Sequence, residues 1–251
     1  MKTIILSDVH GWAGTLRAAT AEAAPGPEDQ LVMLGDLFDR GPESWEVFRE
    51  VKKLAAEMGD RFVLLRGNHE DYLLRTKLSR GEMQIWNQVG REAAVQSFRA
   101  HGENMEDAAP WLREHCETWW EEEDFLCVHA GLMVDPPEVN DEWTLIHDHE
   151  AATRNCYRGP FAVAGHAGLE KATWFAGDGE TEREMPEGTW MPLPESGILC
   201  IDTGCGKGGR LTAMEIENGQ FRLTSYPEKR IGDAGKNESD ENRQEDEEHG
   251  T

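Results

Sequence analysis

Six short aliphatic runs recur along this sequence, and each leads directly into a cluster of polar residues. The runs cover residues 3–6, 31–34, 62–65, 125–128, 161–164 and 198–201, and they lead into SDVHG, GDLFDRG, RGNHE, HAG, GHA and DTGCGKGG. Aliphatic runs of this length predict strands that are buried on both faces. Helical patterns at residues 15–23 and 43–58 separate the first three. Alternating strands and helices predict βαβ units, and therefore an α/β fold built on a central layered sheet.

The polar clusters contain residue types that bind ligands. In α/β sheets, ligands bind beyond the carboxyl ends of the strands, which is where these clusters fall. Taken alone, a Gly-Asp pair is compatible with a turn, and a lone histidine after a strand is more often a packed residue. Their joint occurrence predicts one shared site. Its predicted metal-binding members are Asp8, His10, Asp36, Asn68, His129 and His166.

A mixed set of carboxylate, amide and imidazole ligands favours a particular kind of metal site. Such ligands suit a pair of borderline divalent cations such as Mn, Fe or Zn, whereas an all-oxygen set would favour Mg or Ca. With two metals about 3.5–4 Å apart, one carboxylate can bridge them and a hydroxide can be held between them as nucleophile. The sequence therefore predicts metal-assisted phosphoester hydrolysis, with manganese as the first choice of metal.

The motifs SDVHG, GDLFDRG, GNHE, HAG and GH resemble those of the calcineurin-like metallophosphoesterase superfamily. The spelling DRG…GNHE is most similar to the phosphoprotein phosphatase branch, which includes bacterial and phage serine/threonine phosphatases and symmetrical diadenosine tetraphosphatases. The motifs extend from residue 7 to about residue 210. The resemblance implies a β-sandwich flanked by helices, with a metallophosphoesterase domain over residues 1–231.

The resemblance also implies a role for each motif residue. Asp8 and His10 would hold the first metal, and Asp36 would bridge the two. The second metal would be held by Asn68, His129 and His166. His69 would protonate the leaving oxygen, and Asp39 would orient it, because a neighbouring carboxylate stabilises an imidazolium and fixes its tautomer. Glu70 is expected to fix the loop instead of taking part in the chemistry.

The implied phosphate contacts include one departure from the family pattern. The predicted phosphate-binding residues are Arg40, Arg66, Asn68 and His147. An arginine fork can contact two phosphate oxygens at once. The related phosphatases carry a further arginine after the HAG segment, whereas LIHDHE places His147 there. Arg154 or Arg158 is an alternative source of that positive charge.

Charge and composition limit the partners of the chain. Its 49 Asp and Glu residues outnumber 25 Lys and Arg residues, which gives a formal charge of −24. This argues against a nucleic-acid surface, which needs a basic face, and against acidic membranes. Residues 232–251 carry eight acids against two bases and predict a disordered acidic tail. No apolar run approaches the roughly 18 residues that span a bilayer, and no signal peptide is evident, so we expect a cytoplasmic protein.

Residues 71–123 interrupt the strand pattern and predict a helical cap. Trp86, Trp111 and Trp119 recur there at roughly helical spacing. Such a stripe could stack a nucleobase, but packing of a cap against the sandwich is the favoured interpretation.

Three remaining features predict structural roles. Alternation on both sides of Asn218-Gly219 predicts a type I′ hairpin of edge strands. The glycines of DTGCGKGG resemble a phosphate-cradling loop, but no helix with a P-loop lysine follows, and the family resemblance implies a structural turn beneath the site. Five cysteines without a C-x-x-C pair predict reduced, packed thiols, although Cys200 and Cys205 flank a turn and could pair.

The sequence thus predicts a two-metal phosphomonoesterase that acts on phosphoserine or phosphothreonine in proteins. The alternative is a dinucleoside polyphosphate hydrolase, because the phosphate-handling core is shared. A catalytically silent fold that binds a partner is a third hypothesis. It would require loss of a ligand or of the proton donor, and all are present.

Overall fold

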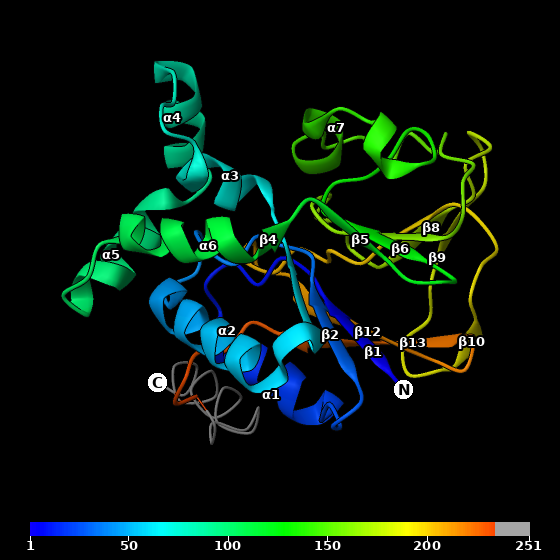
Figure 1. Ribbon diagram of the computed structural model, residues 1–251, viewed down its shortest axis with the longest axis horizontal. Coiled ribbons are helices and arrows are strands. Elements are labelled where there is room, and N and C mark those ends of the chain that lie inside the picture. The colour runs from blue at the N-terminus through cyan, green and yellow to red at the C-terminus, as the bar shows by residue number, and fades with distance from the viewer. Residues whose placement is uncertain (234–251) are drawn as a thin grey trace, which may run out of the picture.

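The computed structural model describes residues 1–233 and consists of two packed sheets with helices on their outer faces (Figure 1). The α/β fold with a β-sandwich flanked by helices is therefore confirmed. All but the first two residues of the predicted acidic tail, 232–251, lie outside the described residues. Within residues 1–233, no helix is long and apolar enough to cross a membrane.

The first sheet contains the three strands that the sequence places at the amino-terminal end. From one edge to the other, its strands are β10 (Met191–Pro192), β13 (Gln220–Pro227), β12 (Arg210–Glu217), β1 (Thr3–Leu6), β2 (Gln30–Met33), β3 (Phe62–Leu65) and β4 (Cys116–Glu117). Strands β1, β2 and β3 run parallel, with Leu6 opposite Met33 and Met33 opposite Leu64. Their carboxyl ends therefore meet at one edge, where the polar clusters follow.

The second sheet repeats this arrangement with the carboxyl-terminal motifs. Its strands, in order, are β5 (Trp119–Glu121), β6 (Leu126–Val128), β7 (Ala162–Ala164), β11 (Ile198–Cys200), β8 (Thr173–Phe175) and β9 (Glu182–Glu184). Strands β6, β7 and β11 are parallel. His129 and His166 follow β6 and β7, so they come from the same end of this sheet.

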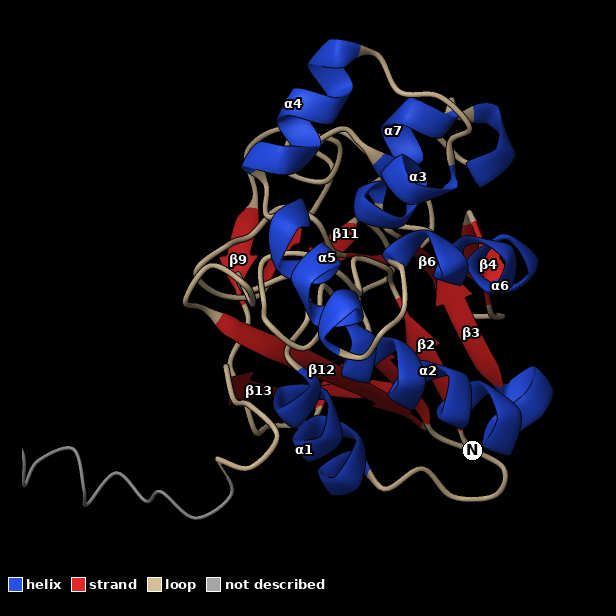
Figure 2. Ribbon diagram, turned by 90° about the vertical axis from the view of Figure 1, so that its left-hand side faces the viewer, coloured by secondary structure: helices blue, strands red, loops and turns tan. Residues whose placement is uncertain are grey.

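Alternation of side chains along the central strands divides the core into layers. Ile4 and Leu6 of β1 face the helices, whereas Ile5 packs between the sheets with Val32 and Leu199. The helices against the first sheet are α1 (Ala13–Ala23) and α2 (Ser44–Met58), which Figure 2 shows over its outer face. Both faces of the central strands are thus buried, as their uninterrupted aliphatic runs predict.

The cap is helical but shorter than predicted. It contains α3 (Asn68–Leu74), α4 (Arg80–Gln88), α5 (Arg91–Ala100) and α6 (Ala109–His115), with the short 3₁₀ helix η2 (Met105–Ala108). Helices α4 and α5 are separated at Gly90, whose φ of 108° does not fit a helix. The helical interpretation of residues 116–121 was wrong. They form β4 and β5, because Trp119 and Trp120 point to opposite faces and pack on different sides of the second sheet.

The carboxyl-terminal hairpin has the predicted turn, with φ of 52° at Asn218 and 72° at Gly219. Its strands are not at the edge, however, since β12 pairs with β1 and β13 pairs with β10. All five cysteines are free, including Cys200 and Cys205. The remaining elements are α7 (Glu142–Ile146) and the 3₁₀ helices η1 (Gly59–Arg61) and η3 (Pro137–Val139).

Candidate active site

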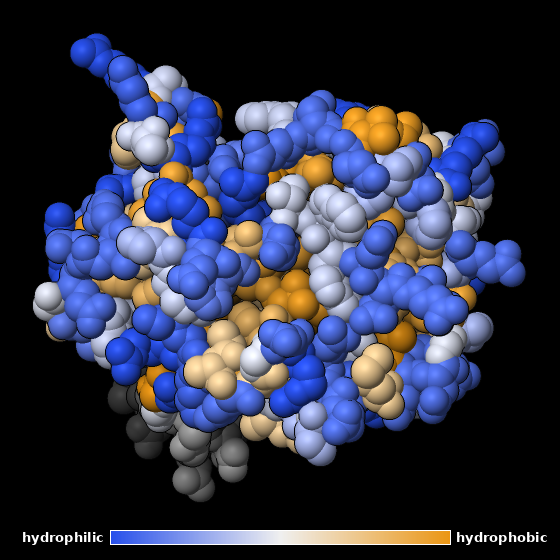
Figure 3. Space-filling model, viewed as in Figure 1, coloured by the Kyte–Doolittle hydropathy of each residue, from blue (hydrophilic) through white to orange (hydrophobic). Residues whose placement is uncertain are grey.

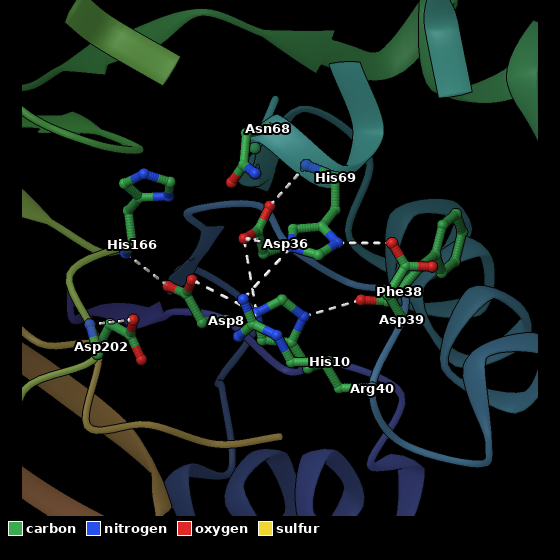
Figure 4. A network of polar contacts seen from close by, with 12 residues as sticks. Asp8, His10, Asp36, Phe38, Asp39, Arg40, Asn68, His69, His166 and Asp202 are labelled. Carbon is green, nitrogen blue, oxygen red and sulfur yellow. Dashed lines mark hydrogen bonds and ion pairs between the residues drawn. The ribbon is translucent and has the colours of Figure 1, made fainter. Parts of the chain in front are cut away.

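The carboxylate of Asp36 lies at the centre of a buried cluster that joins both sheets (Figure 4). Its Oδ2 is 3.5 Å from His10 Nε2, and its Oδ1 is 3.6 Å from His129 Nε2. His129 Nε2 in turn lies 3.3 Å from Asn68 Oδ1 and 3.1 Å from His166 Nδ1. The two oxygens of one carboxylate therefore face two separate groups of potential ligands.

Backbone carbonyls orient the imidazoles. Nδ1 of His10 donates to the Phe38 carbonyl at 2.8 Å, and Nδ1 of His129 donates to the Leu34 carbonyl at the same distance. His166 is turned the other way, with Nε2 3.3 Å from the His147 carbonyl. Because a carbonyl can only accept, each ring nitrogen on the far side is left unprotonated and faces the cluster.

The cluster fits two divalent cations. Asp8 Oδ1 and Asp36 Oδ2 are buried and accept no hydrogen bond from residues 1–233. A buried carboxylate oxygen without a donor is unfavourable unless a cation is close to it. The Arg40 guanidinium lies beside this cluster, with Nη1 2.5 Å from His10 Nε2 and Nη2 3.4 Å from His69 Nε2. Two candidate ligand groups are present, His10–Asp36–His69 and Asp36–His129–His166, each with ligand atoms within 4.8 Å of one another.

Strained backbone is concentrated at this cluster. Nine residues other than glycine have positive φ in the described chain, and six of them are predicted site residues. The six are Asp8 (51°), His10 (43°), Asp36 (53°), Asp39 (69°), Arg40 (63°) and His166 (67°). Left-handed conformations are unfavourable for residues with a Cβ and persist only where the surroundings enforce them. The loops after β1, β2 and β7 therefore hold these side chains in one geometry.

Glu70 fixes the loops that carry Asp36 and Asn68. Its carboxylate accepts hydrogen bonds from the backbone N–H groups of Asp36 (2.7 Å), Leu37 (2.9 Å) and Gly67 (3.1 Å). Burial, together with the nearby Asp36 charge, raises the pKa of Glu70 to about 7. Gly67 must lack a side chain, because a Cβ there would lie 2.1 Å from Asp36 Oδ1.

His69 is oriented by Asp39, as the motifs imply. Its Nδ1 lies 2.5 Å from Asp39 Oδ2, which also accepts a hydrogen bond from Trp86 Nε1 at 2.6 Å. Nε2 then faces Asp36, 3.8 Å from Oδ2. Burial alone would lower the pKa of His69, but the charge of Asp36 and the Asp39 hydrogen bond outweigh it and raise that pKa. His69 can therefore hold a proton at Nε2.

The two carboxylates that face the cluster have opposite pKa shifts. Burial opposes ionisation of Asp36, but four surrounding histidines outweigh it and hold the pKa of that carboxyl well below its usual range. Burial, followed by the charges of Asp202 and Asp36, raises the pKa of Asp8 well above its usual range. Burial lowers the pKa of His10, His129 and His166. Neutral imidazoles and an ionised Asp36 are the forms that bind cations.

The other two predicted phosphate contacts lie at the rim and already have partners. Arg66 Nη1 is 3.5 Å from Asp71 Oδ1, and the same guanidinium is paired with Glu142. His147 Nε2 is 2.8 Å from Asp71 Oδ2. Arg66 and His147 thus share one carboxylate, and His147 reaches the buried cluster through its carbonyl instead of its ring.

Three residues that the sequence analysis did not single out also lie at the site. The ring of His149 stacks on that of His166, with centroids 4.0 Å apart. Asp202 is buried beside Asp8, and its Oδ2 accepts a hydrogen bond from Gly168 N–H at 2.6 Å. The exposed Lys207 lies over Gly168 and contributes to lowering the pKa of His149, after burial. LIHDHE contains two histidines, and the comparison with the family's further arginine points only to the first, so the motif gives no signal for His149.

The alternative cations for that position have other partners. Arg154 is bonded to Asp148, with Nη1 2.6 Å from Oδ2, and also to Glu150. The Arg158 side chain donates from Nε to the Gly177 carbonyl at 2.9 Å. Lys207 makes no ion pair with a carboxylate of residues 1–233.

A buried cluster with two candidate ligand groups around one carboxylate, on a two-sheet sandwich, is the arrangement expected of a metal-dependent phosphoesterase. In agreement, residues 1–215 match the family model of the calcineurin-like phosphoesterases. The chain belongs to this family, and it is a hydrolase of that class.

Relatives and solved structures refine this assignment. A protein of Photorhabdus laumondii named bis(5'-nucleosyl)-tetraphosphatase, symmetrical, is 43% identical over 90% of this chain and 98% of its own length. A protein of the same name from Shigella dysenteriae is 28% identical over 95% and 99%. The crystal structure of a metallophosphoesterase from Sphaerobacter thermophilus has a TM-score of 0.58 at 19% identity, covering 91% of this chain and 90% of that one. Both relatives are named as tetraphosphatases and not as phosphoprotein phosphatases, the class that the sequence placed first.

Proposed function

We propose that this protein hydrolyses dinucleoside polyphosphates, with diadenosine tetraphosphate as the representative substrate. The shared name of the two relatives, which align with almost their whole length, carries this choice of substrate. The position of Asp36 between two groups of candidate ligands supports metal-assisted phosphoester hydrolysis as the reaction. Symmetrical cleavage would break one central P–O bond and add water, so that two nucleoside diphosphates leave.

The predicted ligands divide into two sets around Asp36. Asp8 and His10 would hold one cation, Asn68, His129 and His166 the other, and Asp36 would bridge them. Manganese is the first choice, because the set mixes nitrogen and oxygen donors. Two bound cations stabilise charge on the phosphoryl oxygens and lower the pKa of bound water.

His69 would supply the proton that the leaving group requires. Its Nδ1 is held by Asp39, and its raised pKa favours the protonated form before reaction. When water oxygen bonds to phosphorus and the bridging P–O bond breaks, the Nε2 proton of His69 would pass to the departing diphosphate oxygen. General acid catalysis of this kind is worth about 10²–10⁴-fold.

Three cations would position the phosphate chain. Arg40 points into the cluster beside His10 and His69. Arg66 stands at the rim, and a phosphate there would take the place of the exposed Glu142 carboxylate. Lys207 lies over Gly168, and its charge contributes to lowering the pKa of His149, after burial. Cations at separate positions suit a chain of several phosphates better than one phosphomonoester.

The test compares three substrates with the same purified, manganese-loaded full-length chain. Initial rates are measured for diadenosine tetraphosphate, a phosphothreonine peptide and para-nitrophenyl phosphate, and the nucleotide products are separated by ion-exchange chromatography. We expect the highest kcat/KM for the dinucleotide and ADP as its only nucleotide product. A higher kcat/KM for the phosphopeptide would overturn the proposal in favour of a phosphoprotein phosphatase. Formation of ATP and AMP would contradict symmetrical cleavage.

A further inference from the structure

The cap tryptophans, which could have offered a base-stacking surface, are occupied by packing. Trp86 is 4% exposed and donates its N–H to Asp39. Trp111 packs edge-on against Phe48 and stacks on His115, with ring centroids 4.1 Å apart in the second pair. A nucleobase platform therefore has to be sought elsewhere on the described surface.

Trp143 is different, because its indole is 63% exposed although it lies beside the site. It belongs to the short helix α7, which begins where the Asp141 side chain accepts a hydrogen bond from Thr144 N–H at 2.8 Å. The other face of α7 buries Leu145 and Ile146. The helix is thus fixed to the second sheet, while the tryptophan is left at its outer surface.

One face of the indole is already supported. Trp143 stacks on His147, with centroids 4.8 Å apart and planes at 9°. His147 is held in turn by Asp71 through Nε2, and its carbonyl accepts a hydrogen bond from His166. A supported ring needs little reorganisation to receive a second flat group on its free face.

A series of side-chain contacts places the Trp143 indole near Arg66, one of the predicted phosphate contacts. Asp71 joins His147 to Arg66, and Arg66 is paired with Glu142, the residue before Trp143. Figure 1 shows α7 above the second sheet, across from α3 and α4. In the same view, Figure 3 shows a hollow in the surface between α4 and α7. A nucleotide whose phosphates contact Arg66 would therefore have its base within reach of the indole.

We propose that Trp143 stacks one nucleobase of the substrate and forms, with His147 beneath it, a base-binding subsite. This inference rests on the proposed function and extends it, because it assigns the group that distinguishes a nucleotide from a bare polyphosphate. Stacking on an aromatic ring tolerates any base, since every base has a π-face. The subsite therefore recognises that a base is present and selects weakly among bases.

The experiment compares substrates with and without a base in Trp143→Ala and Trp143→Phe. Stacking of one base is worth about 1–3 kcal/mol, so Trp143→Ala should raise KM for diadenosine tetraphosphate about 5- to 150-fold. KM and kcat for para-nitrophenyl phosphate should not change, and Trp143→Phe should restore most of the affinity for the dinucleotide. Trp190→Ala is the matched control. That tryptophan is also exposed (36%), but its ring contacts Arg222 of β13, on the first sheet.

A second measurement separates this inference from the proposed function. Hydrolysis of para-nitrophenyl phosphate is inhibited with ADP or with pyrophosphate, so that no dinucleotide turnover is needed. We expect ADP to inhibit the parent protein more strongly than pyrophosphate does, and Trp143→Ala to lose that difference. Equal inhibition constants for ADP in the parent and Trp143→Ala would overturn the subsite, even if the dinucleotide is a good substrate. Failure to cleave the dinucleotide, with the ADP difference intact, would overturn the substrate assignment and leave the subsite standing.

Discussion

The buried centre and the exposed rim of the site are built in opposite ways. At the centre, Asp36, His10 and His129 are at most 1% exposed, and each is held by backbone contacts. At the rim, Arg66 pairs with a glutamate that is 64% exposed, and Trp143 is 63% exposed. The centre is fixed before any substrate arrives, whereas the rim has groups that can exchange partners.

This difference separates the reaction from the choice of substrate. Strained loops and buried carboxylates suit metal binding and phosphoryl transfer. Exposed charge pairs contribute little to stability, so they can differ between proteins without unfolding them. Changes at the centre should therefore affect every substrate, and changes at the rim should affect only substrates that reach it.

The largest effect is expected from Asp36→Asn. This change removes the charge that both ligand groups share, and loss of several kcal/mol of transition-state stabilisation corresponds to at least about a thousandfold in kcat. Turnover of para-nitrophenyl phosphate and of the dinucleotide should fall together. Manganese should raise the Tm of metal-stripped parent protein and not that of Asp36→Asn, because a ligand stabilises only the state that binds it. A variant that retains both turnover and the manganese-dependent Tm shift would refute the bridging role.

His69→Asn should reduce kcat by about 10²–10⁴-fold through loss of the proton donor. The manganese-dependent rise in Tm should remain, which distinguishes this variant from Asp36→Asn. The loss should be smaller for para-nitrophenyl phosphate, because its leaving group needs less protonation than a diphosphate. Unchanged turnover of the dinucleotide would assign the proton donor to another group.

Trp86→Phe tests whether the cap supports the centre or merely covers it. The change removes the N–H that Asp39 accepts while keeping a buried aromatic ring. A hydrogen bond to a charged group is worth about 1.5–3 kcal/mol, so we expect a decrease of about 10- to 100-fold in kcat with little change in KM. In a His69→Asn background, the same change should have no further effect, because both act through one proton donor. Additive losses would show that Trp86 acts only through packing.

Much of the fold could be predicted from local patterns, and the exceptions have identifiable causes. Short-range patterns of apolar residues predict the parallel strands and the helices α1 and α2, so the predicted sequence order and approximate bounds of these elements were correct. Residues 116–121 were misassigned because two adjacent tryptophans fit either a helix or a strand until the partner strand β6 is known. The hairpin turn was correct because Asn218-Gly219 encodes it locally. Its place inside the sheet depends on pairing with β1, which is distant in sequence.

The same limit applies to the site. Each of the six predicted metal ligands lies within four residues of the end of a strand, so their common location could be predicted from the sequence. The part of the rim that contains Trp143, His147 and His149 comes from residues 131–160, and within that described segment the five-residue α7 is the only α-helix. Its position depends on long-range contacts such as the His147 carbonyl to His166. For this reason His149 and Trp143 could not be placed from sequence.

The smallest effect is expected from Lys207→Ala, which changes the rim by one charge. An exposed charge contact is worth up to about 1 kcal/mol, so KM for diadenosine tetraphosphate should rise by no more than about fivefold. KM for para-nitrophenyl phosphate should stay the same, since one phosphate held at the centre does not extend to Lys207. Lys53→Ala is the matched control, because it removes the same charge from α2, where Lys53 faces Glu50 and Glu57.

The salt dependence of KM for the dinucleotide distinguishes a direct contact between Lys207 and the phosphate chain from a long-range electrostatic effect. The effect of a direct, partly shielded contact should persist at 0.5 M salt, whereas a long-range effect is screened within about 10 Å at 0.1 M. We expect the ratio of KM values between Lys207→Ala and the parent to fall only partly as salt increases. A Lys207→Arg variant should restore the parent KM for the dinucleotide. An equal rise of KM for both substrates would place Lys207 with the buried centre and break the division between centre and rim.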